Sequence, residues 1–355
     1  MLKEGIIPAI WCYPLSFIFH LLVMIPVFDL HCDLLSYITG IPDADPEHST
    51  EIGSSLVSLR EGNVKLQTMA IYVATEEGST ESGIEQSVAF LELLDNYSQY
   101  VQHVDEAEDW QDVLESDRTT IIAAIENASA FCEEGDDLDD GLAMFETMIE
   151  NTGAMLYVSL THNDENRFGG GNDAPGVGLK PDGRVLLEYL SGMNIAVDLS
   201  HTSDALARGI IECIDKYSLD IPLIASHSNF RAVHNHERNL PDDLVQEIIT
   251  RGGLIGMNFY REFVHETNPD ALYEHILYGI ERGAGTHLAF GSDFFFSLGT
   301  DEDEDNDAQE DFFHEHRNSA QFPHILERLG GMVSEEQLHR IAYANAYNFL
   351  ERLWG

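Results

Sequence analysis

The stretch Val27-Phe28-Asp29-Leu30-His31-Cys32-Asp33 is a short apolar run that ends in His-x-Asp near the start of the chain. In a β-strand successive side chains point to opposite faces, so His31 and Asp33 lie on the same side. An imidazole and a carboxylate then converge on one point, which suits a divalent metal such as zinc. The pair alone also fits an ordinary strand end, so its meaning depends on which residues end the other strands.

Seven further segments have the apolar, β-branched character of strands, and most are followed by helical spacing of apolar residues. Strands are expected at residues 27–33, 64–73, 119–126, 154–161, 194–200, 221–226, 253–260 and 286–292. Helices are expected at residues 56–61, 82–104, 138–150, 183–193, 203–216, 241–251, 268–282, 318–329 and 334–352. This alternation predicts an α/β fold, a (β/α)8 TIM barrel, with a doubly wound open sheet as the alternative. No linker divides the chain, so residues 24–355 are expected to form one domain.

Chemically competent side chains stand at the ends of seven of these strands. They are His31 and Asp33, Glu126, His162, His201, His227, Tyr260 and Asp293. In a barrel the carboxyl ends of all strands meet at one face, where the active sites of this fold lie. A lone histidine at a strand end is more often structural, but its recurrence at the same end of so many strands favours one shared site.

The remaining histidines lie in predicted loops and helices, where a solvated surface position is the usual place for this side chain. This expectation covers, among others, His275 and His316. His234 and His236 are less clear, because they fall in the loop after the sixth strand, close to the predicted site.

The charge balance is strongly acidic. The 355 residues include 18 Lys+Arg and 63 Asp+Glu, for a formal net charge of −45. Such a field repels phosphate backbones and anionic lipid, so nucleic-acid binding is excluded as an expected function. An acidic, lysine-poor surface also suits a protein that works in high salt, since salt screens self-repulsion. The acidic run at 301–311 is expected to be a solvated loop.

The four cysteines are Cys12, Cys32, Cys132 and Cys213, and their spacing matches neither a disulfide framework nor a zinc knuckle. This pattern predicts a reducing, cytoplasmic compartment. Residues 1–23 are largely apolar and are interpreted as an extension outside the fold, either a signal, an anchor or a mis-assigned start. Export or membrane anchoring through residues 1–23 is therefore the alternative location.

From about residue 25 to the C-terminus the chain resembles the membrane dipeptidase (renal dipeptidase) family, peptidase family M19. The resemblance is carried by the order and spacing of six segments. They are Asp29-Leu30-His31-Cys32-Asp33, Ala124-Ile125-Glu126, Leu160-Thr161-His162-Asn163, Val197-Asp198-Leu199-Ser200-His201, Ser226-His227-Ser228-Asn229 continuing to His236-Glu237-Arg238-Asn239, and Gly291-Ser292-Asp293-Phe294.

The resemblance implies a barrel of the metal-dependent hydrolase type that holds two zinc ions per chain. One ion is expected on His31 and Asp33 and a second on His201 and His227, with Glu126 bridging the two. Two cations jointly lower the pKa of a shared water, so a metal-bridging hydroxide is the expected nucleophile.

The resemblance also implies roles around the metals. Asp293 is expected to hold the nucleophilic water and pass its proton to the leaving amine, and His162 to donate to the oxyanion. Arg238, assisted by Tyr260, is expected to grip the free carboxylate of the substrate, because a planar fork of donors matches a carboxylate. A clamp at a fixed distance from the metals restricts substrates to dipeptides. The family further implies acceptance of a C-terminal D-residue and a homodimer.

This sequence departs from the family pattern at three places beside the site. The bridging carboxylate is followed by Asn127 and Ala128 where the family has Gly-Gly, Glu237 stands where proline is common, and Asp-Phe-Asp-Gly becomes Asp293-Phe294-Phe295-Phe296. Two alternatives stay open: another metal-dependent amidohydrolase acting on cyclic amides, and a catalytically degenerate barrel kept as a binding protein.

Overall fold

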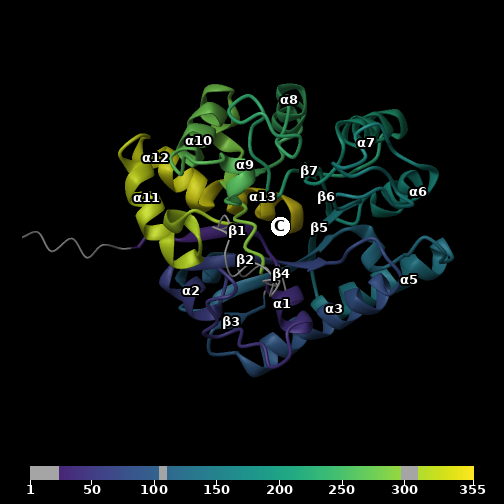
Figure 1. Ribbon diagram of the computed structural model, residues 1–355, viewed down its shortest axis with the longest axis horizontal. Coiled ribbons are helices and arrows are strands. Elements are labelled where there is room, and N and C mark those ends of the chain that lie inside the picture. The colour runs from purple at the N-terminus through teal and green to yellow at the C-terminus, as the bar shows by residue number, and fades with distance from the viewer. Residues whose placement is uncertain (1–23, 104–109, 297–310) are drawn as a thin grey trace, which may run out of the picture.

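The computed structural model describes residues 24–103, 110–296 and 311–355 (Figure 1). The predicted extension at residues 1–23 and all but the last residue of the acidic run lie outside these ranges. Within the ranges, no helix combines the length and the apolar character that a bilayer crossing requires. Cys32, Cys132 and Cys213 are free and buried.

Eight parallel strands form the centre of the molecule. They are β1 (Val27–Cys32), β2 (Val64–Tyr72), β4 (Thr119–Glu126), β5 (Met155–Ser159), β6 (Ala196–Asp198), β7 (Leu223–Ile224), β8 (Ile255–Met257) and β9 (Leu288–Phe290). They are ordered β7-β6-β5-β4-β2-β1-β9-β8, and a parallel bridge between Ala225 and Ile255 joins the two ends of this order. The result is a nearly closed α/β barrel, so the predicted barrel is confirmed and the open sheet is wrong.

Helices surround this sheet (Figure 1). They are α1 (Leu34–Gly40), α2 (Leu56–Glu61), α3 (Ser79–Asn96), α4 (Trp110–Glu115), α5 (Leu138–Thr152), α6 (Pro181–Leu190), α7 (Asp204–Tyr217), α8 (Asp242–Thr250), α9 (Arg261–Val264), α10 (Ala271–Glu281), α11 (Phe322–Gly330), α12 (Glu335–His339) and α13 (Asn345–Trp354). The sequence pattern did not predict α1, α4 or α9. These helices are short, so they show too few turns for an apolar periodicity to stand out.

The start of α7 illustrates how local sequence positions the site. The Ser203 Oγ accepts a hydrogen bond from the backbone N–H of Leu206 at 2.9 Å, which satisfies one of the free donors of the first turn. Leu206, Ile210 and Ile214 recur at helical spacing and are buried. The N-terminal end of α7 is therefore anchored by Ser203, two residues after His201.

The C-terminal helix α13 packs against buried side chains of the barrel strands. Phe349 and Leu350 belong to one buried apolar cluster with Phe28, Leu66 and Ile122 from the strands. In Figure 1 α13 lies over the middle of the molecule, between the outer helices. Apolar packing therefore fills this part of the interior, and the polar strand ends are left for chemistry.

Two helix predictions are wrong in their extent. The helix expected at 82–104 ends at Asn96 and is followed by a short strand, β3 (Val101–Gln102), which pairs with β4. The segment 95–98 reads Asp-Asn-Tyr-Ser, and such residues favour turns over helix interiors. The last helix, expected at 334–352, is interrupted by a π-helical turn at Arg340–Ala344.

Candidate metal centre

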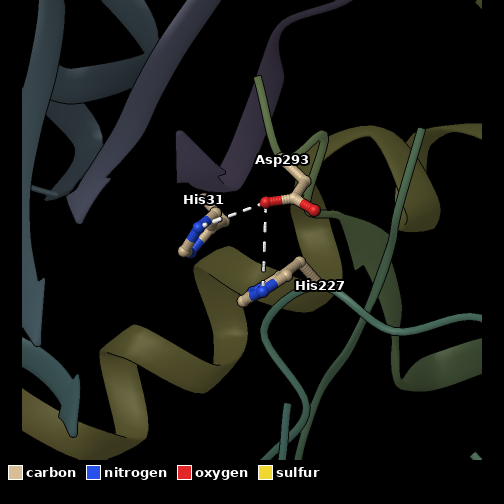
Figure 2. Close-up of side chains that lie close together, drawn as sticks. All are labelled: His31, His227 and Asp293. Atoms are coloured by element: carbon tan, nitrogen blue, oxygen red, sulfur yellow. Dashed lines mark ion pairs between the residues drawn. The ribbon is translucent and has the colours of Figure 1, made fainter. Parts of the chain in front are cut away.

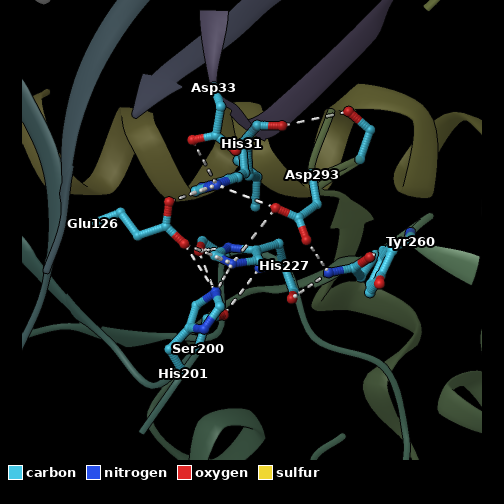
Figure 3. A network of polar contacts seen from close by, with 12 residues as sticks. His31, Asp33, Glu126, Ser200, His201, His227, Tyr260 and Asp293 are labelled. Carbon is cyan, nitrogen blue, oxygen red and sulfur yellow. Dashed lines mark hydrogen bonds and ion pairs between the residues drawn. The ribbon is translucent and has the colours of Figure 1, made fainter. Parts of the chain in front are cut away.

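Six titratable side chains from the carboxyl ends of the strands converge at one point. They are His31, Asp33, Glu126, His201, His227 and Asp293, and Figure 3 shows them facing one another. All six are buried. The strands bring together residues that are up to 262 positions apart in the sequence, from His31 to Asp293, as parallel barrel topology requires.

Glu126 occupies the middle of the cluster. Its Oε2 lies 3.3 Å from the Nε2 of His31, and its Oε1 lies 2.9 Å from the Nε2 of His201 and 3.4 Å from the Nε2 of His227. The two oxygens of one carboxylate therefore face two different groups of histidines. This is the position that a ligand shared between two cations takes.

The two aspartates stand on either side of His31. The Oδ1 of Asp33 is 3.9 Å from the His31 Nε2, and the Oδ1 of Asp293 is 3.4 Å from it. The same Asp293 oxygen lies 4.0 Å from the Nε2 of His227, as Figure 2 shows. The other oxygen of Asp293 accepts a hydrogen bond from the Asn258 amide at 2.7 Å, which fixes the carboxylate.

The outer ring nitrogens of His31 and His201 are each held by one partner. The Nδ1 of His31 lies 2.6 Å from the Tyr157 hydroxyl, which in turn donates to a backbone carbonyl oxygen. The Nδ1 of His201 lies 2.8 Å from the Asn163 side-chain oxygen, which only accepts. Both rings therefore carry their proton on Nδ1 and turn an Nε2 lone pair toward the cluster.

A three-residue chain holds His227 in the same way. Its Nδ1 lies 2.7 Å from the Ser226 Oγ, and that hydroxyl donates to the Asp198 Oδ2 at 2.6 Å. Asp198 is buried and also accepts from the backbone N–H groups of Ser226 and Ser200. The carboxylate thus orients the serine, and the serine orients the histidine.

These donor atoms fit divalent cations. The Nε2 atoms of His201 and His227 lie 2.9 Å apart, and two lone pairs at this distance repel unless a positive charge lies beside them. The His31 Nε2 and the Asp33 Oδ1 are buried without a hydrogen-bond partner. Imidazole nitrogen and carboxylate oxygen are ligands that zinc accepts. The cluster is therefore consistent with a buried metal site.

Burial penalises the charged forms of these groups. It raises the pKa of Glu126 to about 8 and, offset in part by His31, the pKa of Asp293 to about 6. Burial also lowers the pKa of His201 and His227 well below the usual value of a histidine. His201 and His227 are therefore neutral and ready to bind a cation, and a cation offsets the cost of ionising the carboxyls.

Backbone strain is concentrated at the same site. His201 and Asp293 have φ angles of 63° and 62°, in the left-handed region that side chains disfavour. Asn127, directly after Glu126, has a φ of 83°. The positive φ explains why glycine suits this position, and asparagine tolerates it better than most residues do.

A cavity of about 400 Å³ opens onto the cluster. Its lining combines cluster residues with polar and aromatic neighbours: Asp33, Ser36, Tyr72, Glu126, His162, Asn163, His201, Tyr260, Phe263, Asp293, Phe295 and Phe296. This volume lies near the lower end of the range of roughly 300–1,000 Å³ for small-molecule sites. The cavity therefore suits a small ligand.

The other predicted site residues lie beside the cluster. His162 lines the cavity, packs against the His201 ring at 4.1 Å between centroids, and has its pKa lowered to about 3 by burial. Tyr260 also lines the cavity. Arg238 is buried but is not part of the lining. Glu237 is exposed, so its charge does not enter the site.

Arg238 makes no ion pair with any carboxylate of the described residues. Its guanidinium donates to the Ser228 Oγ at 2.6 Å and to the His227 carbonyl oxygen at 3.1 Å, and it lies over the Phe263 ring at 5.4 Å. Its Nε is buried without a partner. A surface ion pair, the ordinary alternative for this arginine, is therefore absent.

Sequence reasoning missed the residues that support the cluster. Tyr157 and Asn258 contact metal-site residues from other strands, and no local motif marks them. Asp198, Asn163 and Ser226 were inside recognised segments but had no assigned role. A short polar residue next to a strand-end histidine, as in Ser226-His227, is the signal that could have identified one of them.

The surface expectation for other histidines is wrong at two positions. His275 and His316 are fully buried. The His275 ring accepts from the Phe230 N–H and contacts the Val264 carbonyl oxygen, so it acts as a neutral connector between segments. His234 and His236 line a second cavity, which shares Tyr260 with the first.

Comparison with known proteins identifies relatives. Residues 15–351 match the family model described as membrane dipeptidase (peptidase family M19). An uncharacterized dipeptidase from Schizosaccharomyces pombe is 26% identical over 281 residues, which cover 72% of this chain and 63% of that protein. Dipeptidase verJ from Clonostachys rogersoniana is 31% identical over 143 residues, 39% of this chain and 36% of that protein. The chain thus spans less than two thirds of the length of either relative.

Two solved structures share the fold. The dipeptidase AC, a metallo peptidase, covers 94% of this chain and 99% of its own with a TM-score of 0.76 at 22% identity. A metallo peptidase from Rhodobacter sphaeroides, liganded with a phosphinate mimic of the dipeptide L-Ala-D-Ala, covers 93% of this chain and 100% of its own. Its TM-score is also 0.76, at 21% identity.

Proposed function

The chain belongs to the membrane dipeptidase family, peptidase family M19, and from this premise we propose that it is a binuclear zinc dipeptidase. It hydrolyses the peptide bond of dipeptides, including those with a C-terminal D-residue. The bound L-Ala-D-Ala mimic in the Rhodobacter sphaeroides relative supports this substrate class. The modest volume of the cavity, about 400 Å³, supports it as well.

The donor sets support two cations. His31, Asp33 and Glu126 form one group whose ligand atoms lie within reach of a single ion, and Glu126, His201 and His227 form a second. Two zinc ions bound there would lower the pKa of a shared water so that hydroxide is available at neutral pH. The single observation that carries the proposal is the position of Glu126, with one carboxylate oxygen facing each group.

Asp293 is the proton carrier in this proposal. Its Oδ2 is held by Asn258, while its Oδ1 faces His31 and His227 and is free to accept a proton. A carboxylate held at this position is suited to act as a general base for a water beside it. Asp293 therefore takes the proton of the attacking water and returns it to the nitrogen of the leaving amine.

His162 and Arg238 handle the negative charges of the substrate. His162 is neutral because its pKa is lowered to about 3, so its N–H donates to the carbonyl oxygen as negative charge develops there. Arg238 holds the terminal carboxylate with Tyr260. The buried, unpartnered Nε of Arg238 and its freedom from any ion pair within the described residues support this assignment.

Hydrolysis assays on zinc-loaded protein test the proposal. A panel of L,L and L,D dipeptides is expected to be cleaved, and His201→Ala is expected to abolish cleavage, whereas His324→Ala, an exposed position, is expected to leave it intact. Arg238→Ala is expected to raise the KM for dipeptides about tenfold or more, because charge-assisted hydrogen bonds are lost. Cleavage of cyclic amides without dipeptides would instead support the other amidohydrolases, and metal binding with neither activity would support a binding protein.

A homodimer is a further part of the proposal, and it rests on family resemblance alone. Light scattering coupled to gel filtration measures the mass in solution directly. A mass near twice 39.7 kDa is expected. A mass near 39.7 kDa would contradict it.

A further inference from the structure

The cavity is lined by two kinds of side chain. Its lining combines the titratable residues of the metal cluster with four aromatic residues, Tyr260, Phe263, Phe295 and Phe296, which we call the aromatic wall. All four residues are half-buried, so each has ring surface that is not covered by the rest of the protein. A substrate whose scissile bond lies at the cluster places a side chain against this wall.

The wall is held in place by ring packing. Tyr260 packs edge-on against Phe263 and Phe295, with centroid distances of 4.7 and 5.3 Å. Phe312, which does not line the cavity, packs behind Phe295 at 5.2 Å. Such aromatic pairs add to the stabilisation that burial alone gives, so the wall is a built surface and not a set of loose side chains.

Phe296 is supported from the side of α1. Its ring lies 5.6 Å from the Tyr37 ring, edge-on. A Cβ atom added at Gly40 would lie 3.3 Å from the Phe296 Cζ, so the glycine leaves the space in which this ring sits. Phe295 and Phe296 also stand where the resembling family has Asp-Gly, so these two rings of the wall depart from the family pattern.

We propose that the aromatic wall makes the enzyme select dipeptides whose C-terminal residue carries a large apolar side chain. This inference rests on the proposed function, in which Arg238 holds the terminal carboxylate. The Phe263 ring lies beneath the Arg238 guanidinium at 5.4 Å, so the residue that bears the carboxylate lies next to the wall. Phe263, Tyr260 and Phe295 then flank its side chain.

The selectivity arises from desolvation. An apolar side chain gains free energy when it leaves water for the ring surface, at roughly 25 cal/mol per Å². A polar side chain in the same place loses its hydration, and the four rings offer only the Tyr260 hydroxyl in return. Without substrate that hydroxyl donates to the Glu262 carboxylate at 3.2 Å, and in the proposed function it turns to the terminal carboxylate of the substrate, so it does not serve a polar side chain.

The test compares two peptides of nearly equal shape. Leucine and asparagine side chains are similar in size and carry no charge, so the kcat/KM ratio of Ala-Leu to Ala-Asn reports the wall and not the acidic field of the protein. Peptides with L and D stereochemistry at the second residue are both measured on zinc-loaded enzyme. The wild-type ratio is expected to be about tenfold or more.

Matched variants assign the preference to the wall. Phe295→Ser is expected to lower the Ala-Leu to Ala-Asn ratio at least about fivefold, and Phe295→Leu is expected to retain most of it, because the surface stays apolar. Phe322→Leu is the control: this buried ring packs on Phe259 and Phe290 and does not line the cavity, and the ratio is expected to stay unchanged. If Phe295→Ser fails to fold, Phe296→Ser gives the same comparison.

Binding separates this inference from the proposed function. Kd values of the same peptides are measured on Asp293→Asn by calorimetry. If no dipeptide is cleaved by the wild type but Ala-Leu binds at least about tenfold tighter than Ala-Asn, the proposed function fails and the inference stands. Dipeptide cleavage with a ratio near one, or a ratio that Phe295→Ser leaves unchanged, would overturn the inference and leave the function standing.

Discussion

At the scale of single residues, each histidine of the cluster is oriented by a hydrogen bond between its Nδ1 and a side chain outside the metal cluster. For His227 this neighbour is Ser226, whose hydroxyl connects the ring to the buried Asp198 carboxylate. Such indirect contacts fix the tautomer and raise the basicity of a ligand, and their loss typically costs about tenfold to a hundredfold in metal affinity.

We therefore expect Ser226→Ala to weaken zinc binding by about ten- to a hundredfold. Competition against a calibrated chelator measures the two zinc affinities. Ser159→Ala is the matched control, because the Ser159 hydroxyl donates to the same Asp198 oxygen at 2.8 Å but contacts no ligand histidine. Equal losses in both variants would mean that Ser226 matters only for the packing of Asp198.

The residues of the cluster could be found from the sequence because each follows a recognisable strand. His31, His201 and His227 stand at strand ends, and barrel topology alone brings strand ends together. Tyr157 could not be found, because its contact with His31 links residues 126 positions apart and depends on register between strands. Arg238 could be assigned only by resemblance, since nothing in its own segment shows that it is buried without an ion pair.

At the scale of elements, the connection after β4 is organised by Asn127. Its φ of 83° turns the chain out of the strand. Its side-chain amide donates to the Val73 carbonyl oxygen and to Thr75, and its oxygen accepts from Ser129 and Asn166. The replacement of the family glycine is thus offset by four hydrogen bonds, which hold the segment directly after Glu126.

Two substitutions at Asn127 separate these effects. Asn127→Gly loses the hydrogen bonds, whereas Asn127→Ala loses them and is also strained at positive φ. We expect the alanine variant to have a free energy of unfolding lower than that of the glycine variant by about 1 kcal/mol or more, even though glycine loses more backbone entropy on folding. Urea unfolding at fixed zinc concentration measures both. An alanine variant as stable as the glycine variant would contradict this interpretation.

The packing of α10 depends on a buried neutral histidine. His275 accepts from the Phe230 N–H at 3.1 Å, and burial lowers its pKa from 6.5 to about 4. In the unfolded chain this ring binds a proton below about pH 6.5, while in the folded chain it does so only below about pH 4. The unfolded state therefore binds more protons in this window, and the contribution of His275 to stability falls as the pH falls.

We expect the stability difference between wild type and His275→Gln to shrink by up to ~3 kcal/mol as the pH is lowered from 6.5 to about 4. Urea unfolding across this range measures the difference directly, and carboxylates common to both proteins cancel. A difference that stays constant or grows on acidification would show that the folded protein tolerates the protonated ring.

Element types were predictable where the pattern was long, and less so where it was short. All eight barrel strands were expected from apolar, β-branched runs, including β7, which is only Leu223–Ile224 in the structure. The interruption at Arg340–Ala344 was not, because the apolar spacing continues through a π-turn as it does through an α-helix. The strand β3 was hidden in the predicted helix, since two residues carry no periodicity of their own.

At the scale of the whole molecule, the net charge of −45 sets a general property. Raising the KCl concentration from about 0.1 M to about 1 M shortens the Debye length from about 10 Å to about 3 Å, which screens repulsion among surface carboxylates. We expect Tm to rise over this range in calorimetry on the zinc-loaded protein, because compaction brings these charges together. A Tm that is constant or falls would mean that ion pairs, and not repulsion, dominate the surface.

The central claim is that strand ends from across the barrel hold two metals around Glu126. The most direct test is the zinc stoichiometry of the folded chain, measured by titration calorimetry and by elemental analysis after removal of free metal. Two zinc ions per chain are expected for the wild type, and fewer for Glu126→Gln, in which the shared ligand loses its charge. One zinc ion or none in the folded wild-type chain would contradict the claim.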